Sequence, residues 1–157
     1  MDKIPMTPEG LEMLEEENKR LSEVERPAVI RAIAEAREHG DLSENAEYHA
    51  ARERQSFIEG RLKELKGIIG HADVIDASRL SGDMIRFGAT VTLADEETDD
   101  ETTYRIVGSH EADVAKGKLS VTAPLGRALI GKELGGQVEV TTPGGTKYYE
   151  IIKVVYK

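Results

Sequence analysis

Residues 38–48 read Glu38-His39-Gly40-Asp41-Leu42-Ser43-Glu44-Asn45-Ala46-Glu47-Tyr48 and separate two long segments of helical pattern. Gly40 is the only glycine over residues 11–59, and glycine tolerates the left-handed conformation that ends many helices. We therefore expect the chain to reverse at Gly40. We expect Asp41 to accept hydrogen bonds from the amides that open the second helix. The two helices then form a hairpin whose free end carries the carboxylates of Asp41 and Glu44.

The segment before this turn has a clear helix start and a narrow apolar stripe. Thr7-Pro8-Glu9 combines a capping threonine, a proline at the first helical position and an acid in the first turn. A narrow stripe favours a seam between two helices over a wide globular face; its members are Leu11, Leu14, Leu21, Val24, Ile30 and Ile33. Pro27 lies inside the pattern and should kink or interrupt the helix over residues 23–26.

The segment after the turn carries a matching stripe: Ala46, Ala50, Phe57, Ile58, Leu62, Leu65, Ile68 and Ile69. A helix of roughly 30 residues rises about 1.5 Å per residue, so the turn would stand about 45 Å from the base of the hairpin. A dimerisation arm or interaction rod is an alternative use of such a hairpin.

From Ala72 the apolar period changes from that of helices to that of strands. The predicted strands are residues 72–76, 90–93, 104–107, 119–121, 138–140 and 149–156, with one short helix over residues 124–132. The acidic run 95–101 and the segment 142–146 are predicted turns. We expect an α+β protein in which residues 1–76 form a coiled-coil hairpin with its tip at 39–45. Residues 77–157 then form a domain with an antiparallel sheet.

Composition excludes several classes of function. The formal net charge is −9, with 11 basic and 18 acidic side chains in residues 1–76 against 10 and 12 in residues 77–157. Such an acidic chain is a poor candidate for gripping nucleic acid unaided, because Lys and Arg supply most phosphate affinity. No cysteine is present, which excludes disulfides and thiolate zinc sites. We expect a cytoplasmic protein, since no signal-peptide pattern or membrane span is found.

The motifs of a self-contained enzyme are also missing: there is no phosphate-binding glycine loop, nucleophile elbow or His-x-x-x-His pair. His39 and His49 flank the tip and are interpreted as surface residues. Asp41 and Glu44 have two interpretations. Asp-x-x-Glu resembles a capping box. Alternatively, because Mg²⁺ prefers six oxygen ligands, two carboxylates would complete the coordination of an ion held mainly by another protein.

Basic side chains also lie near the tip. Arg37 precedes Gly40, and Arg52 and Arg54 follow within the second helix. They either guide a phosphate chain towards the acids or balance neighbouring glutamates.

At these residues the chain resembles the bacterial Gre transcript-cleavage factors. The likeness is strongest over residues 34–53, Ala34-Glu35-Ala36-Arg37-Glu38-His39-Gly40-Asp41-Leu42-Ser43-Glu44-Asn45-Ala46-Glu47-Tyr48-His49-Ala50-Ala51-Arg52-Glu53. Further blocks at 4–7, 87–91, 104–108, 124–132 and 142–145 extend it over the whole chain.

The resemblance implies a coiled coil followed by a domain of the FKBP-like fold. It implies an accessory factor, not an enzyme, whose partner is bacterial RNA polymerase. The coiled coil would enter the secondary channel and act at the nascent RNA 3′ end, with DNA contacted only indirectly and no membrane. No cofactor would be resident; Mg²⁺ would be shared with the polymerase. We expect a monomer.

The resemblance also assigns roles to residues. Asp41 and Glu44 match the catalytic acids, with Asp41 as a ligand of the shared metal, and Arg37 and Arg52 match the basic spot near the RNA. The docking segment matches Ser120, Ala123, Pro124, Leu125 and Gly126, where Ala123 replaces the usual serine. A channel-binding inhibitor that does not cleave is the main alternative. A prolyl isomerase is disfavoured by the lack of Trp and the single Phe (Phe87) after residue 76.

Overall fold

The computed structural model describes residues 2–41 and 45–157, and the chain divides into two compact units. Residues 11–71 form the first unit, and residues 2–10 join residues 72–157 in the second. The predicted α+β class is confirmed. The sequence placed residues 2–10 and 72–76 with the hairpin, but strand β1 (Ile4–Met6) pairs in parallel with strand β2 (Ala72–Val74) within the second unit.

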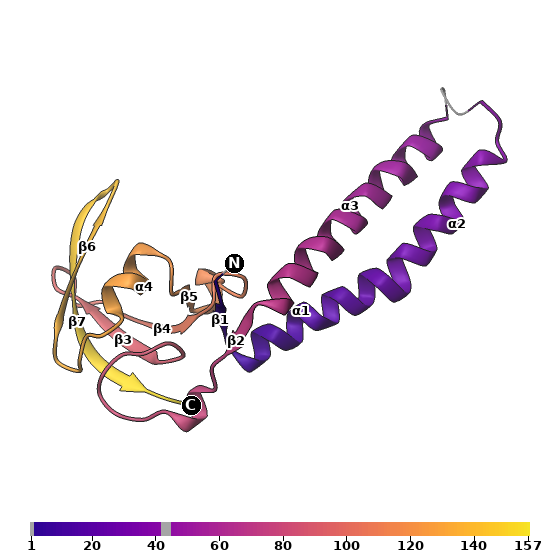
Figure 1. Cartoon of the computed structure of the whole chain (residues 1–157). Coiled ribbons are helices and arrows are strands. Elements are labelled where there is room, and N and C mark those ends of the chain that lie inside the picture. The colour runs from indigo at the N-terminus through magenta and orange to yellow at the C-terminus, as the bar shows by residue number, and fades with distance from the viewer. Residues whose placement is uncertain (1, 42–44) are drawn as a thin grey trace. The chain divides into compact units, whose positions relative to one another are not determined.

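The first unit is a helical hairpin. Helix α1 (Pro8–Arg20), the π-helix η1 (Leu21–Glu25) and helix α2 (Arg26–Arg37) follow one another, and helix α3 (Ala46–Gly70) runs back beside α2 (Figure 1). Thr7 caps α1 as predicted, since its Oγ1 accepts a hydrogen bond from the Gly10 amide at 3.0 Å. Within the described residues, the helices are too short or too polar to cross a bilayer.

The interruption predicted at Pro27 is confirmed as a π-helix. Proline has no amide hydrogen, and its ring crowds the carbonyl four residues earlier, here that of Glu23. The preceding turn widens, so that the amide of Arg26 donates to the carbonyl of Leu21, five residues back. The chain therefore stays helical through the proline.

The widened turn shifts the seam of the hairpin. Leu21 and the next fully buried seam residue, Val29, are eight positions apart rather than seven, because the π-helix adds one residue. Val24 and Ile30, which the sequence placed in the stripe, are 61% and 51% exposed. Phe57, also predicted for the stripe, is exposed, whereas Ile58 is buried as predicted. The buried seam is Leu14, Leu21, Val29, Ile33, Ala36, Ile58, Leu62, Leu65 and Ile68.

Ion pairs reinforce the seam from its edges. Arg26 on α2 forms two hydrogen bonds of 2.8 Å to the Glu59 carboxylate on α3. Arg61 on α3 likewise binds Glu17 on α1 at 2.7 and 2.9 Å. The hydrogen bond from Arg61 lowers the pKa of Glu17. Paired, planar contacts of this kind help to fix the register of the two arms.

The second unit is built on a five-stranded sheet of order β5-β4-β3-β7-β6. Its elements are β3 (Thr90–Asp95), β4 (Glu101–Val107), β5 (Lys118–Ser120), α4 (Pro124–Leu129), β6 (Gln137–Thr142) and β7 (Gly145–Val155), with short 3₁₀ turns at Ala77–Arg79 and Val114–Lys116. The prediction of an antiparallel sheet is wrong for one pair, because β4 and β5 are parallel. The connection over residues 108–117 turns the chain back, so that Lys118 lies beside Arg105 with the same strand direction.

Side chains from the sheet and from α4 form one core: Ile85, Ala89, Val91, Leu93, Ile106, Leu119, Leu129, Val138, Val140 and Ile151. The acidic run forms the predicted hairpin turn between β3 and β4, in which Asp95 Oδ1 accepts from the Glu97 amide at 2.8 Å. The turn between β6 and β7 is also confirmed.

One carboxylate unforeseen from the sequence holds the start of α1. Glu111 accepts from the amides of Thr7 (2.9 Å) and Gly108 (3.1 Å), and the Thr7 hydroxyl donates to it as well. Thr7 is completely buried. A Cβ at Gly108 would lie 2.4 Å from the Pro5 carbonyl oxygen, so only glycine permits this close approach.

Candidate functional site

The turn after α2 includes Gly40, as the sequence predicted. Helix α2 ends at Arg37, and the amide of Gly40 donates to its carbonyl at 3.3 Å. Gly40 has φ of +98°, which L side chains rarely adopt. Asp41 follows directly and is exposed. The turn therefore presents a carboxylate at the end of α2.

Asp41 is not the cap of the second helix. Asn45 is the N-cap of α3, and its Oδ1 accepts from the Tyr48 amide at 3.0 Å. The Asn45 Nδ2 donates at 2.6 Å to the carbonyl of Ala36 in the last turn of α2. One amide therefore closes both helix ends, and the capping interpretation of Asp41 is wrong. Asparagine's preference for N-caps was the sequence signal that identifies this residue.

The other acid predicted for the tip, Glu44, lies outside the described residues. Of the two histidines near the tip, His39 Nε2 lies 3.7 Å from a Glu47 carboxylate oxygen, and His49 packs edge-on against the Tyr48 ring. Over residues 2–41 and 45–157, no three His, Asp or Glu side chains are grouped as a metal site would require.

Arg37 and Arg52, which the family resemblance predicts to lie near the RNA, come together on Tyr48. Their guanidinium carbons lie 5.9 and 5.8 Å from the ring centre, and Arg52 Nη1 donates to the phenol oxygen at 2.9 Å. Hydrogen bonds from Arg37 and then Arg52 lower the pKa of Tyr48. The third basic residue, Arg54, pairs instead with Glu25. Sequence reasoning missed Tyr48, although its spacing of four from Arg52 places both on one helix face.

The predicted docking segment lies at the junction of β5 and α4 and is tightly folded. The Ser120 carbonyl accepts from the Ala123 amide at 3.1 Å, and the Ser120 hydroxyl accepts from the Thr122 amide at 3.1 Å. A Cβ on Gly126 would lie 2.1 Å from the Ser120 carbonyl oxygen, so glycine is required there. Ala123 is the N-cap of α4 and offers no side-chain acceptor. Pro124 occupies the first helical position, and Leu125 packs against the core.

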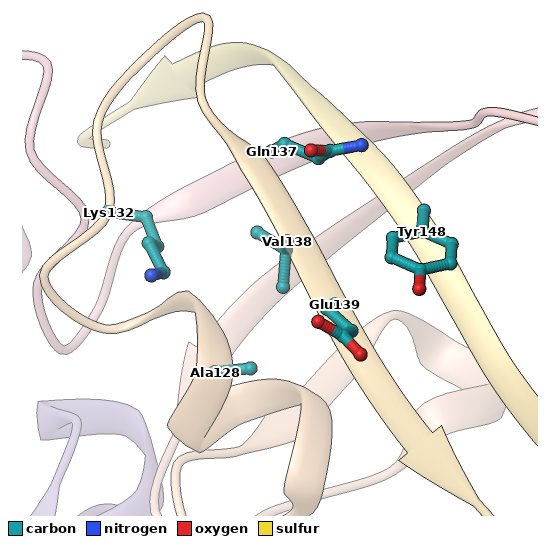
Figure 2. A pocket seen from close by; sticks show the side chains of 6 residues that line it. All are labelled: Ala128, Lys132, Gln137, Val138, Glu139 and Tyr148. Carbon is teal, nitrogen blue, oxygen red and sulfur yellow. The ribbon is translucent and has the colours of Figure 1, made fainter.

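A shallow pocket of about 430 Å³ lies beside α4. Figure 2 shows Ala128 on the helix facing Val138 and Glu139 on β6, with Tyr148 on β7 and Lys132 at the rim. Tyr148 is the single aromatic side chain among the lining residues, and two of the others are charged. This lining does not resemble the aromatic pocket that a prolyl isomerase would need, so the isomerase interpretation gains no support.

Two family models match the chain in sequence. The N-terminal domain of transcription elongation factors of the GreA/GreB type matches residues 4–74, and the C-terminal GreA/GreB domain matches residues 80–156. A solved structure of GreA factor homolog 1 from Thermus thermophilus is 25% identical and covers 98% of this chain and 99% of its own, with a TM-score of 0.44.

Curated relatives match over nearly their full length. Transcription elongation factor GreA of Rhodospirillum rubrum is 64% identical and covers 98% of both chains. The proteins of the same name from Ruegeria pomeroyi and Jannaschia sp. are 65% and 66% identical, with 99% of each chain covered. With both family models matched in order, the chain belongs to the GreA/GreB family of transcription elongation factors.

Proposed function

We propose that this elongation factor inserts its hairpin into the secondary channel of RNA polymerase and stimulates the polymerase to cleave backtracked nascent RNA. The observation that carries the proposal is the exposed Asp41, which directly follows the turn and is not the cap of either helix.

In this proposal the chain supplies acids that the polymerase lacks. Asp41 provides a carboxylate ligand to a Mg²⁺ held mainly by the polymerase, and Glu44 orients the attacking water. The ion, when bound, lowers the pKa of that water and stabilises the displaced oxygen. The chemistry of the donors fits, because Mg²⁺ takes one or two carboxylates and fills its remaining positions with water and phosphate oxygens. The chain is therefore an accessory factor that acts in trans.

The remaining predicted residues have supporting roles. Arg37 and Arg52 bind phosphates of the displaced RNA, since guanidinium groups contact phosphate oxygens in a fixed, forked geometry. The β5–α4 segment from Ser120 to Gly126 docks on the polymerase. Its internal hydrogen bonds support this role, because a segment already ordered loses little entropy on binding.

The test is to incubate a stalled, backtracked elongation complex with this protein and to size the RNA. We expect short 3′ fragments to be released and the shortened transcript to resume elongation when nucleotides are added. Binding to the complex without release of fragments would contradict the proposal and would favour the alternative of a channel-binding inhibitor.

A further inference from the structure

Tyr48 connects the two arms of the hairpin near the turn. Arg37 is the last residue of α2, whereas Tyr48 and Arg52 lie one turn apart on α3. Both guanidinium groups lie within 6 Å of the Tyr48 ring centre, and Arg52 also donates to the phenol oxygen. Each contact is attractive, because a cation is drawn to the face of an aromatic ring.

The partners of Arg37 and Arg52 differ from those of four other arginines on the hairpin. Arg20, Arg26, Arg54 and Arg61 each form an ion pair with a glutamate. Among the residues that the structure describes, Arg37 and Arg52 take part in no ion pair. A phenol orders a guanidinium group without cancelling its charge. Tyr48 therefore orders the two positive charges and leaves them uncancelled.

Arg37 and Arg52 also border a groove of about 280 Å³ on the hairpin. Its other lining residues are Ile30, Ile33, Ala34 and Gln55, and Ile30 is half exposed. An unpaired nucleotide has an anionic phosphate and an apolar base face with polar edges. The groove offers a group for each part of the nucleotide. The guanidinium groups match the phosphate, the aliphatic side chains match the face of the base, and the Gln55 amide matches its polar edge.

We propose that Tyr48 is a positioning residue, which holds Arg37 and Arg52 as a pair that binds the phosphate of an unpaired RNA nucleotide. The base of that nucleotide lies in the groove that these two arginines border. The inference rests on the proposed function, because the nucleotide belongs to the displaced 3′ segment. Tyr48 acts through the arginines and has no role in holding metal.

The first test measures cleavage of backtracked RNA by variants of the full chain. We expect Tyr48→Leu to slow stimulated cleavage about 10-fold, because it loses both ring contacts and the hydrogen bond. Tyr48→Phe keeps the ring and should lose only about 2- to 3-fold. Phe57→Leu is the matched control: Phe57 is an exposed aromatic residue on α3 that stacks with Arg54 at 5.0 Å. It should change the rate less than about 2-fold.

The decisive comparison repeats Tyr48→Leu in an Arg37→Gln/Arg52→Gln background. If Tyr48 acts through the arginines, the substitution should add less than about 2-fold there, because the effects of coupled residues are not additive. The concentration of Mg²⁺ at half-maximal cleavage should stay unchanged throughout. An undiminished 10-fold loss in the double-arginine background, or an equal loss for Phe57→Leu, would overturn the inference.

A readout on the free protein separates this inference from the proposed function. Tyrosine ionises near pH 10, and the two arginines lower the pKa of Tyr48. In an absorbance titration, Arg37→Gln/Arg52→Gln should therefore raise the pKa of Tyr48, and Tyr48→Phe should remove the Tyr48 transition, which identifies it. Unchanged titration would refute the contact on which the inference depends. If the pKa of Tyr48 responds to the arginine substitutions as expected but the parent protein stimulates no cleavage, the proposed function is refuted. The RNA role assigned to Tyr48 is then refuted with it.

Discussion

Ala123 is a single side chain whose replacement should strengthen docking. It stands at the N-cap of α4 with φ of −67° and ψ of 153°, a conformation suited to capping, but its methyl group accepts no hydrogen bond. Ala123→Ser should stabilise this helix start by about 1 kcal/mol. We expect a higher melting temperature and up to about fivefold tighter polymerase binding, measured by competition. Ala112→Ser, at an exposed position outside any helix start, is the control. Equal behaviour of the two variants would contradict the capping argument.

For single residues, the sequence predicted the roles that depend on local conformation and missed those that depend on distant contacts. Gly40 and Thr7 were predicted correctly, because positive φ and the threonine-proline helix start are local properties. Asp41 was wrongly predicted as a cap. Asp and Asn are comparable caps, and the choice is made by the distant contact from Asn45 Nδ2 to the Ala36 carbonyl. Glu111 was missed because Thr7, which it binds through both the amide and the hydroxyl, is about a hundred residues away in the chain.

At the scale of the helices, the Asn45 side chain joins the end of α2 to the start of α3 through two hydrogen bonds. Asn45→Ala loses the cap of α3 and leaves the Ala36 carbonyl without this donor, so unfolding should become easier by about 2 kcal/mol. Asn45→Ser restores the cap alone and should recover about half of that loss. Thermal unfolding followed by circular dichroism measures both effects, with the exposed Ser56→Ala as the control. A melting temperature unchanged in Asn45→Ala would show that the two contacts contribute nothing.

The elements themselves were largely predictable. Both arms of the hairpin, five strands of the sheet and the short helix α4 follow from apolar periodicity. The seam was predicted only in part. Pro27 predicted an interruption but not its type, and after the π-helix Val29 is buried in place of the predicted Ile30. The parallel pairing of β4 with β5 is set by the path of a loop, which periodicity does not encode.

At the scale of the whole molecule, the two units carry different parts of the proposed function. The hairpin carries Asp41, Arg37, Arg52 and Tyr48, and the sheet unit carries the β5–α4 segment. The chain passes from one unit to the other at residues 10–11 and 71–72. The β1–β2 pair lies next to both crossings in the sequence, and Glu111 binds the residue that caps α1.

Removal of the Glu111 carboxylate should therefore weaken the sheet unit. Glu111→Ala leaves the buried Thr7 hydroxyl and two amides without their acceptor, which should lower the free energy of unfolding by roughly 2–4 kcal/mol. Urea denaturation of the full chain measures the loss. Glu97→Ala, in the exposed turn between β3 and β4, is the control and should stay within about 0.5 kcal/mol of the parent protein. A Glu111→Ala midpoint equal to that of the control would contradict this role.

The rate of RNA cleavage stimulated by Asp41→Asn tests most directly whether this chain supplies a catalytic carboxylate to the polymerase active site. The amide keeps the size of the side chain but removes the charge that a metal ligand needs. Glu38→Gln, an equal change of charge three residues earlier, is the matched control. We expect Asp41→Asn to lose roughly 100-fold or more of the stimulated cleavage, since even residues that support metal ligands are worth about 10–100-fold. It should still compete with the parent protein for polymerase, and Glu38→Gln should cleave normally. Cleavage by Asp41→Asn at the parent rate would contradict the role of this carboxylate in the polymerase active site.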